Sequence, residues 1–301
     1  MISSLMVALT PPIYKRDADA RRYIAAVESA DGQPLEASVR TAITTFIIGC
    51  KSDGIWDCIN ASCILSCART LTGALVPLKG PTPTSFNFVS GDYSRTTGLV
   101  GNGTTKYLNS NRNNNADVAT NHHISIYYTR LSTTNNEILM GYRPAGIDTG
   151  GKWTGLRIAA SAAPLASSFA SIPNADVNQS GAVVALNSTT FQGLSRTGTA
   201  NYTSRAVGAN VTQTSTSTTA ASGSIFVFAL NNGGTPSGFT TSRASFYSIG
   251  ESVDLALLDS RVATLISNSA FAINTGLNPL NYDADTIAYV NAGYAAGGTL
   301  A

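Results

Sequence analysis

The spacing of hydrophobic residues divides this chain into helical ends and a long β region. Apolar residues recur every three or four positions in the runs 17–31 and 34–49, and each run meets a glycine that suits a helix C-terminus. A third run with the same period covers 252–271. Between the second and third runs, short apolar segments are separated by Gly and Asn turns, which is typical of strands. We therefore expect a mainly β protein with α-helices flanking the β region at both ends.

The β region contains more than ten short strand candidates and almost no helix. They include 124–128, 137–142 and 153–158, and the two strongest are 224–230 and 243–249. The run 225–230 is apolar at every position, so we place it in the middle of a sheet with both faces covered. This pattern favours an antiparallel two-sheet jelly-roll sandwich.

The opening of the first helical run returns near the end of the sequence. The tripeptide Asp-Ala-Asp occurs at 17–19 and again at 283–285. In each copy a tyrosine follows the second aspartate four positions later. Aspartates suit the N-terminal end of a helix, and a repeat indicates modular construction. We expect residues 55–59 to add a helical turn to the first copy. The predicted parts are an N-terminal arm (1–16), an N-terminal helical unit (17–61), the jelly-roll sandwich (62–250), a helix packed on the sandwich (251–274) and a truncated C-terminal copy of the helical unit (275–301).

The composition excludes two classes of partner. Charged residues make up 12% of the chain, against about 25% in typical domains. The net charge of +2 is too weak for a nucleic-acid binder, and a hydrophobic content of 43% argues against disorder. No apolar run approaches the ~20 residues that span a bilayer. We expect no nucleic-acid partner and no membrane insertion.

Four cysteines crowd into eighteen positions, at Cys50, Cys58, Cys63 and Cys67. Their spacing lacks the pairs of structural zinc sites, and no histidine lies near them. Two interpretations stay open, namely buried thiols around a short helix, or a disulfide or intersubunit bridge.

Two stretches of the sequence resemble a known fold family. Residues 98–108 and 243–255 resemble the first and last signature strands of concanavalin A-like, laminin-G-type jelly rolls in tailed-bacteriophage virion proteins. The Asp-Ala-Asp motif and the run Gly-Cys-Lys-Ser-Asp-Gly-Ile-Trp at 49–56 are similar to the helical unit that precedes such domains in phage tail-fibre proteins. The resemblance covers most of the chain. It implies a place on the virion surface, after synthesis in the bacterial host cytoplasm, and it brings no catalytic residues.

An Asn-rich segment and nearby aromatic residues suggest a carbohydrate-binding site. Amide groups offer hydrogen bonds to a sugar, and aromatic rings offer a stacking platform, to which Tyr127 and Tyr128 could also contribute. The alternatives are plain turn chemistry for the Asn residues and core packing for the tyrosines. We expect no cofactor, although Asp117 could join main-chain oxygens around calcium. The candidate carbohydrate-binding residues are Asn111, Arg112, Asn113, Asn114, Asn115, Asp117, Tyr142 and Trp153.

The sequence argues against catalysis and against a metal site. Retaining and inverting glycosidases need a pair of carboxylates. Only Glu137 could lie on a concave face of the sandwich, and the carboxylate nearest to it in the sequence is Asp148. The Glu-x-Asp-x-x-Glu pattern of sandwich glucanases is absent. His122 and His123 would point to opposite faces of a strand, so they cannot easily share one ion. We expect no enzyme activity and a structural role for both histidines.

These observations predict a non-enzymatic bacteriophage virion structural protein. The favoured form is a tail fibre, spike or other appendage that presents a lectin-like sandwich to glycans of the host surface. The alternative is a capsid decoration protein that stabilises the head lattice. We expect a homo-oligomer, with a trimer among the options. Other virion proteins would bind through residues 1–14 and the two helical units.

Overall fold

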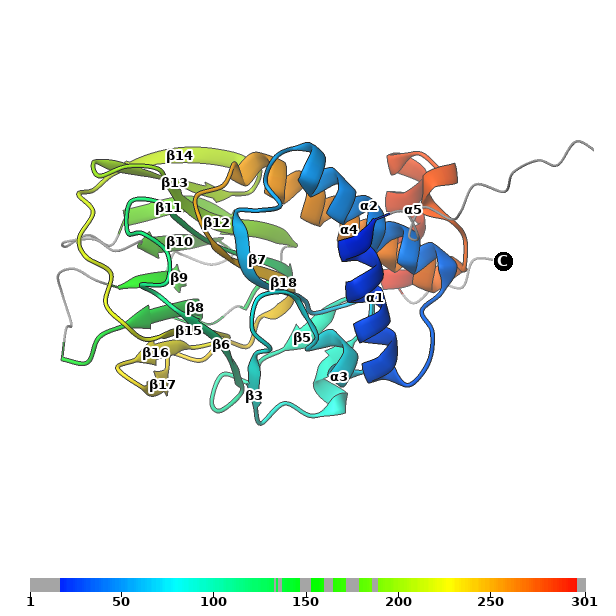
Figure 1. The fold of residues 1–301 in the computed structure, drawn as a ribbon, viewed down its shortest axis with the longest axis horizontal. Coiled ribbons are helices and arrows are strands. Elements are labelled where there is room, and N and C mark those ends of the chain that lie inside the picture. Colours follow the sequence, from blue (N-terminus) through cyan, green and yellow to red (C-terminus); the bar gives the residue numbers. More distant parts are fainter. Residues whose placement is uncertain are drawn as a thin grey trace, which may run out of the picture.

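The protein is described by a computed structural model for residues 17–132, 134, 137–146, 153–159, 165–171, 179–185 and 189–296. The helices gather at one end of the molecule and the β-sandwich forms the other (Figure 1). The helices are α1 (Ala18–Asp31), α2 (Ala37–Ser52), α3 (Leu71–Ala74), α4 (Leu255–Thr275) and α5 (Ala284–Ala295), with short 3-10 turns η2 (Ser90–Asp92) and η3 (Pro279–Asn281).

The strands form two sheets that lie face to face, as the sequence predicted. Sheet A has the order β14-β13-β12-β7-β18-β1-β2, with β5 and β4 attached beside β18. Its strands are β1 (Ile59–Ile64), β2 (Pro77–Lys79), β4 (Tyr93–Ser94), β5 (Gly98–Val100), β7 (His122–Arg130), β12 (Thr190–Arg196), β13 (Asn201–Ala206), β14 (Ala209–Thr214) and β18 (Arg243–Gly250).

Sheet B has the order β11-β10-β9-β8-β15-β6-β3, with the β16–β17 hairpin attached beside β8. Its pairs are antiparallel except for β16 with β8, which is parallel. Its strands are β3 (Thr84–Phe86), β6 (Tyr107–Asn113), β8 (Ile138–Arg143), β9 (Thr154–Ala159), β10 (Leu165–Ser171), β11 (Gln179–Ala185), β15 (Ser224–Val227), β16 (Leu230–Asn232) and β17 (Thr235–Ser237).

Sheet A is covered on both faces. Successive side chains of a strand point to opposite faces, so β7 sends Ile124 and Ile126 into the core between the sheets. Tyr127 points the other way and joins the core formed with the helices. Phe46 of α2 meets Phe246 of β18 edge-on, with ring centroids 5.8 Å apart. The molecule therefore has three layers, made of helices, sheet A and sheet B.

Local sequence signals set the helix ends. The side chain of Asp17 caps α1 by accepting from the backbone N of Ala20 at 3.0 Å, and Gly32 ends the helix with a φ of 69°. Asp254 caps α4 in the same way, and Gly276 ends it with a φ of 72°. The long α4 packs against α2 and against β12. The predicted helix packed on the sandwich is therefore present.

Two local predictions were wrong. Residues 55–59 do not extend the N-terminal helical unit, because Ile59 already pairs with Gly250 of β18. Strand β1 thus crosses the predicted boundary at residue 62. The apolar run 225–230 lies in the middle of sheet B, between β8 and β6, as expected. It is not one strand, however, since Phe228 has a φ of 71° and the chain turns there into β16.

The structure shows where the four cysteines lie and which of the predicted segments it describes. All four cysteines are free, and Cys50, Cys63 and Cys67 are buried. Cys50 lies on α2, Cys58 just before β1, Cys63 on β1 and Cys67 just after it, so the four do not surround one short helix. Burial raises the pKa of Cys50 and of Cys63 to about 12, so both thiols are protonated at neutral pH. The predicted arm 1–16 and residues 297–301 lie outside the described ranges. Within those ranges no helix combines the length and the apolar character needed to cross a bilayer.

Candidate functional site

Lys51 joins the two parts of the N-terminal helical motif, the Asp-Ala-Asp run and the run 49–56. Lys51, in the last turn of α2, places its Nζ 2.7 Å from a carboxylate oxygen of Asp17 and 2.7 Å from one of Asp19. The hydrogen bond from Lys51 lowers the pKa of Asp19, so the pair stays charged at neutral pH. The N-terminal end of α1 is thereby tied to the C-terminal end of α2.

The same lysine approaches a tryptophan that a second lysine also contacts. Nζ of Lys51 lies 5.7 Å from the ring centroid of Trp56, and Nζ of Lys79 on β2 lies 4.8 Å from it. Lys79 also donates to the backbone oxygen of Trp56 at 2.8 Å. Cations at these distances are attracted to the ring face. This contact connects the turn after α2 to sheet A.

A third contact of the motif reaches α4. Arg261 binds both carboxylate oxygens of Asp53, with Nε at 2.6 Å and Nη2 at 2.9 Å. Such a bidentate pair fixes direction as well as distance. Gly49 makes room for the guanidinium, since a Cβ at this position would lie 2.8 Å from it. We use the name helix clamp for Asp17, Asp19, Lys51, Asp53, Trp56, Lys79 and Arg261.

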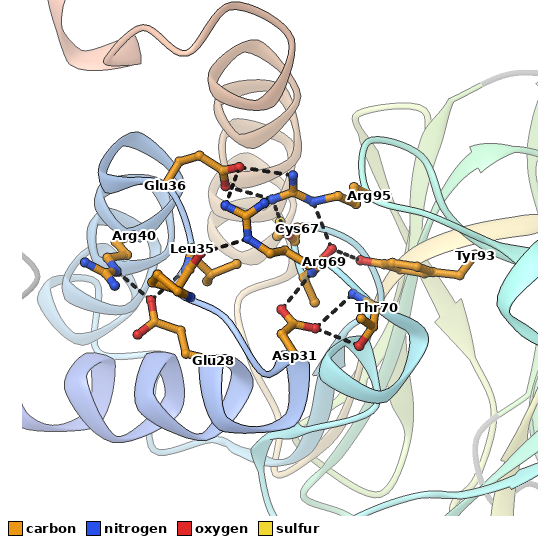
Figure 2. Close-up of polar contacts among 12 residues, drawn as sticks. Glu28, Asp31, Leu35, Glu36, Arg40, Cys67, Arg69, Thr70, Tyr93 and Arg95 are labelled. Atoms are coloured by element: carbon orange, nitrogen blue, oxygen red, sulfur yellow. Dashed lines mark hydrogen bonds and ion pairs between the residues drawn. The ribbon is translucent and has the colours of Figure 1, made fainter.

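A second junction lies at the other end of α1 (Figure 2). The carboxylate of Asp31 accepts from the backbone N of Arg69 at 2.7 Å and of Thr70 at 2.8 Å, and from the Thr70 hydroxyl at 2.7 Å. Glu28 accepts from the backbone N of Leu35 at 2.9 Å and from Arg40 at 2.6 Å. These bonds hold the loop between α1 and α2 and the loop that follows β1.

Glu36 is the centre of the same junction. It pairs with Arg69 at 2.8 Å and with Arg95 at 2.8 Å (Figure 2). Arg95 also donates to the backbone oxygens of Cys67 at 3.2 Å and Ala68 at 3.1 Å. Together with the helix clamp, this junction fixes the helices to the sandwich at two separate places.

The Asn-rich segment forms an internal network instead of an open loop of amides. Arg112 makes two hydrogen bonds to Asp117, one of them at 2.9 Å from Nε, and Asn60 donates to the same carboxylate at 3.0 Å. Asp117 is 7% exposed and Asn114 is fully buried. Arg112 thus occupies the carboxylate that the sequence suggested for calcium. Within the described residues no group of three or more His, Cys, Asp or Glu side chains could hold a metal ion.

The other asparagines of the segment lie at the surface. Asn111 has a φ of 55° and donates to the backbone oxygen of Thr82 at 2.8 Å. The Oδ1 of Asn113 accepts from the hydroxyl of Ser224 at 3.3 Å, and Asn115 is exposed. The structure therefore pairs Arg112 with Asp117 and buries Asn114 elsewhere, where its amide donates to the backbone oxygen of Ala221 at 3.3 Å. The amides of Asn111, Asn113 and Asn115 stay exposed.

The predicted aromatic residues do not share one surface. Tyr142 is 5% exposed, lies in the core between the sheets and donates to the backbone oxygen of Ser222 at 2.6 Å. Tyr128 lies in that core too, whereas Tyr127 points to the helices. Trp153 is half-buried and its ring covers Gly155, where a Cβ would lie 2.8 Å from it. Sugar binding by the eight predicted residues stays a prediction.

The structure reveals an aromatic group that the sequence did not single out. Phe86 stacks on Tyr107 with centroids 4.4 Å apart and planes 3° apart. The ring of Tyr107 also lies 4.7 Å from that of Phe226 and 6.1 Å from that of Phe239. We call these four residues the aromatic strip.

The aromatic strip lies on the face of sheet B that points away from sheet A. Leu108, Ile225 and Val227 point into the core between the sheets, so their neighbours Tyr107 and Phe226 point outward. Phe86 is 36% exposed. In the sequence, the outward direction of Tyr107 and Phe226 was indicated by their alternation with Leu108 and Val227. Joining these residues into one group required the register between β3, β6 and β15.

The two histidines point to opposite faces of sheet A, as expected. Nε2 of His123 lies 2.9 Å from the hydroxyl of Ser248, and its Nδ1 contacts the backbone oxygen of Glu251. His122 is also fully buried, and neither of its ring nitrogens has a hydrogen-bond partner among the described residues. Burial lowers the pKa of each histidine to about 4. Both are therefore neutral at physiological pH.

The candidate catalytic carboxylate has an internal role. Glu137 is 5% exposed and accepts hydrogen bonds from the hydroxyl of Thr240 at 2.6 Å and the backbone N of Thr241 at 2.9 Å. These bonds close the loop before β18 over the start of β8. Asp148, the carboxylate paired with it in the sequence, lies outside the described residues.

Comparisons with known proteins find partial matches among solved structures. No protein-family model and no curated protein matches the sequence. Solved structures with a similar fold include the NanB sialidase of Streptococcus pneumoniae, with 10% identity and a TM-score of 0.36 over 53% of this chain and 27% of that one. The match thus spans about a quarter of the sialidase.

Two further structures match part of this chain. One is the CBM40 domain of the Ruminococcus gnavus IT-sialidase bound to α2,3-sialyllactose, with 12% identity and a TM-score of 0.35 over 48% of this chain and 82% of that one. The other is the binding domain of botulinum neurotoxin serotype D, with 11% identity and a TM-score of 0.44 over 72% of this chain and 52% of that one. All three are partial similarities of the backbone.

The helix clamp predicts a loss of stability when its lysine is neutralised. Lys51→Met keeps the apolar stem but leaves Asp17 and Asp19 without their shared cation. The free energy of unfolding, measured in urea, should therefore fall by about 1–3 kcal/mol. Arg22→Met is the matched control. Its side chain is 75% exposed and pairs with Asp19 alone, so the expected cost is below about 0.5 kcal/mol. Equal losses in the two variants would contradict a clamp centred on Lys51.

The buried histidines predict a loss of stability in mild acid. Each has a pKa of 6.5 when unperturbed and about 4 in the fold, so the unfolded chain takes up protons first as the pH falls. The stabilisation is complete above pH 6.5 and is lost as the pH falls toward 4, by about 3 kcal/mol for each imidazole. Urea unfolding followed across this range measures the slope. His122→Leu should flatten it, and an unchanged slope would rule out His122 as a source.

Proposed function

We propose that this chain is a non-enzymatic structural protein of a tailed-bacteriophage particle, in which the helices attach the chain to the particle and the sandwich faces the host envelope. The helix clamp is the observation that carries this proposal. The residues of the phage-like motif, namely Lys51, Asp53 and Trp56, are all engaged in fixing α1, α2, α4 and β2 to one another. This supports the motif as a device for building a connected helical base under a β domain.

The contacts of the glutamates fit structural roles for these four residues. A glycosidase needs two carboxylates on either side of its substrate. Each of the four glutamates in this chain instead has a partner within the fold. These partners are Arg40 for Glu28, Arg69 and Arg95 for Glu36, Thr240 and Thr241 for Glu137, and Asn121 for Glu251.

The aromatic strip is the surface that we propose for contact with host glycans. Phe86 is the most exposed of its rings, and Asn109 and Asn111 follow Tyr107 along the same strand. Aromatic faces beside amide groups suit the apolar and polar sides of a sugar ring. Each contact would be shallow, so binding would depend on several copies acting together on one particle. A homo-oligomeric appendage meets this requirement.

The location on the particle is tested by counting copies. Quantitative mass spectrometry of gradient-purified particles from the source culture should find this chain at roughly one copy to several tens of major capsid protein, as expected for an appendage. A ratio approaching one to one would instead favour the capsid decoration protein. Absence of the chain from particles that contain the other virion proteins would refute a structural role.

The binding surface is tested with substitutions in the aromatic strip. Phe86→Ala and Tyr107→Ala should weaken the adsorption of the multimerised protein to host cells, or to polysaccharide extracted from them, about tenfold or more. Val118→Ala, at a position that is 67% exposed and outside the strip, is the control and should leave adsorption unchanged. Equal adsorption by all four proteins, with unaltered thermal unfolding, would remove the strip as the binding surface.

A further inference from the structure

A hollow of about 770 Å³ lies between helix α1 and the segment that runs from α3 through β2 to Phe88. Tyr23, Ala26 and Ala30 line it from α1, where they fall on one face of the helix. The two alanines are small, so this face of α1 leaves room beside it. Hollows of about 300–1,000 Å³ are typical of sites for small organic molecules. We call this hollow the α1 groove.

The wall of the α1 groove that faces α1 is apolar. Leu71 begins α3, Leu75 directly follows that helix, Pro77 begins β2 and Phe88 lies just before η2. All four side chains are half-buried, so each still has apolar surface in contact with water. Covering such surface is favourable. The groove therefore suits the apolar body of a ligand.

The two walls are fixed by the junction at the end of α1 (Figure 2). Asp31 accepts hydrogen bonds from Arg69 and Thr70, and the hydroxyl of Thr70 in turn caps α3 by accepting from the backbone N of Gly73 at 3.1 Å. A Cβ at Gly73 would lie 2.2 Å from the Asp31 carboxylate, so this glycine allows α3 to approach α1 closely. The groove is thus part of the folded framework, as ligand sites usually are.

Two polar residues of α1 indicate what kind of molecule the groove takes. Tyr23 is 5% exposed, and its hydroxyl forms no hydrogen bond with any described residue. A buried hydroxyl without a partner is unfavourable, so a ligand with an acceptor is stabilised here. Of the described residues that line the groove, Arg22 is the only charged one. Its one ionic partner is Asp19, which Lys51 also neutralises.

We propose that the α1 groove binds an amphipathic monoanion, such as a medium-chain fatty acid, whose apolar chain lies against Leu71, Leu75 and Phe88. Arg22 pairs with the carboxylate, and Tyr23, the next residue of α1, offers it a hydrogen bond. A cationic ligand is disfavoured, because no carboxylate of the described residues lines the groove. This inference is independent of the aromatic strip and of the place of the protein on a particle.

The probe for this site is undecanoic acid with a terminal dansyl group, whose fluorescence rises in apolar surroundings. We expect saturable binding to the full chain with a Kd at or below about 10 µM. Decanoate should displace the probe. Decanol has the same chain length but no charge, so displacement by decanol should need at least about ten times the concentration.

Two pairs of matched variants locate the site. Ala26→Trp fills the groove and should weaken probe binding at least about tenfold, whereas Ala25→Trp, at the neighbouring position outside the groove, should leave it unchanged. Arg22→Met should weaken binding about tenfold, and Arg21→Met should not. All four positions are exposed, so thermal unfolding should match that of the unaltered protein.

Three results would overturn the proposal. The first is equal binding by Ala26→Trp and Ala25→Trp, or no saturable binding at about 100 µM. The second is displacement by decanol at the same concentration as decanoate, which would remove the anionic class of ligand. The third is binding by a chain that lacks residues 1–14 but not by the full chain, which would make the apolar N-terminal segment the occupant. Equal binding by these two chains supports a free small molecule.

Discussion

Sheet A is buried on both faces, and the rest of the structure depends on this constraint. Strands β7 and β18 lie in the middle of the sheet, with sheet B on one side and the helices on the other. A buried polar group needs a partner, because an unpaired one costs about 1–3 kcal/mol. His123, Ser125 and Ser248 satisfy this need by bonding to one another, with distances of 2.9 and 2.7 Å. The apolar residues on the other side of these strands' core, such as Tyr127 and Phe246, are buried because the helices cover them.

This requirement explains why charged contacts occupy the ends of the helices. Burial of apolar residues such as Phe46 and Phe246 supplies most of the stability, since each large apolar side chain contributes about 1.5–3 kcal/mol. Apolar contact has little directional preference, so it does not by itself fix how a helix is oriented. The bidentate pair of Asp53 with Arg261 and the pairs of Glu36 with two arginines do fix direction. Burial thus holds the helices on sheet A, and the charged contacts determine how they lie.

Local patterns predicted the elements but not their contacts. The strand candidates 124–128 and 243–249 fall within β7 and β18, and the helix candidate 252–271 overlaps α4, because periodicity reports which face is buried. The turn at Phe228 was missed because a non-glycine residue with a positive φ leaves no mark in an apolar run. The Asn-rich segment suggests one surface in the sequence, although Asn114 is buried and Asn115 is exposed. The aromatic strip combines three strands and the loop residue Phe239, so only the register of sheet B could assemble it.

Helices α1 and α5 show how two substitutions can change the face that a repeated helix packs against the protein. Position four after the capping aspartate is Arg21 in α1, where it is exposed, and Ile287 in α5, where it is 5% exposed. An isoleucine here adds an apolar residue on a face that α1 leaves to solvent, and this face rests on α4. Val27 of α1 is replaced by Gly293, which removes a side chain from the face that α1 buries. The cap and the acidic first turn are kept, so α5 forms the same helix while a different side of it contacts the body of the protein.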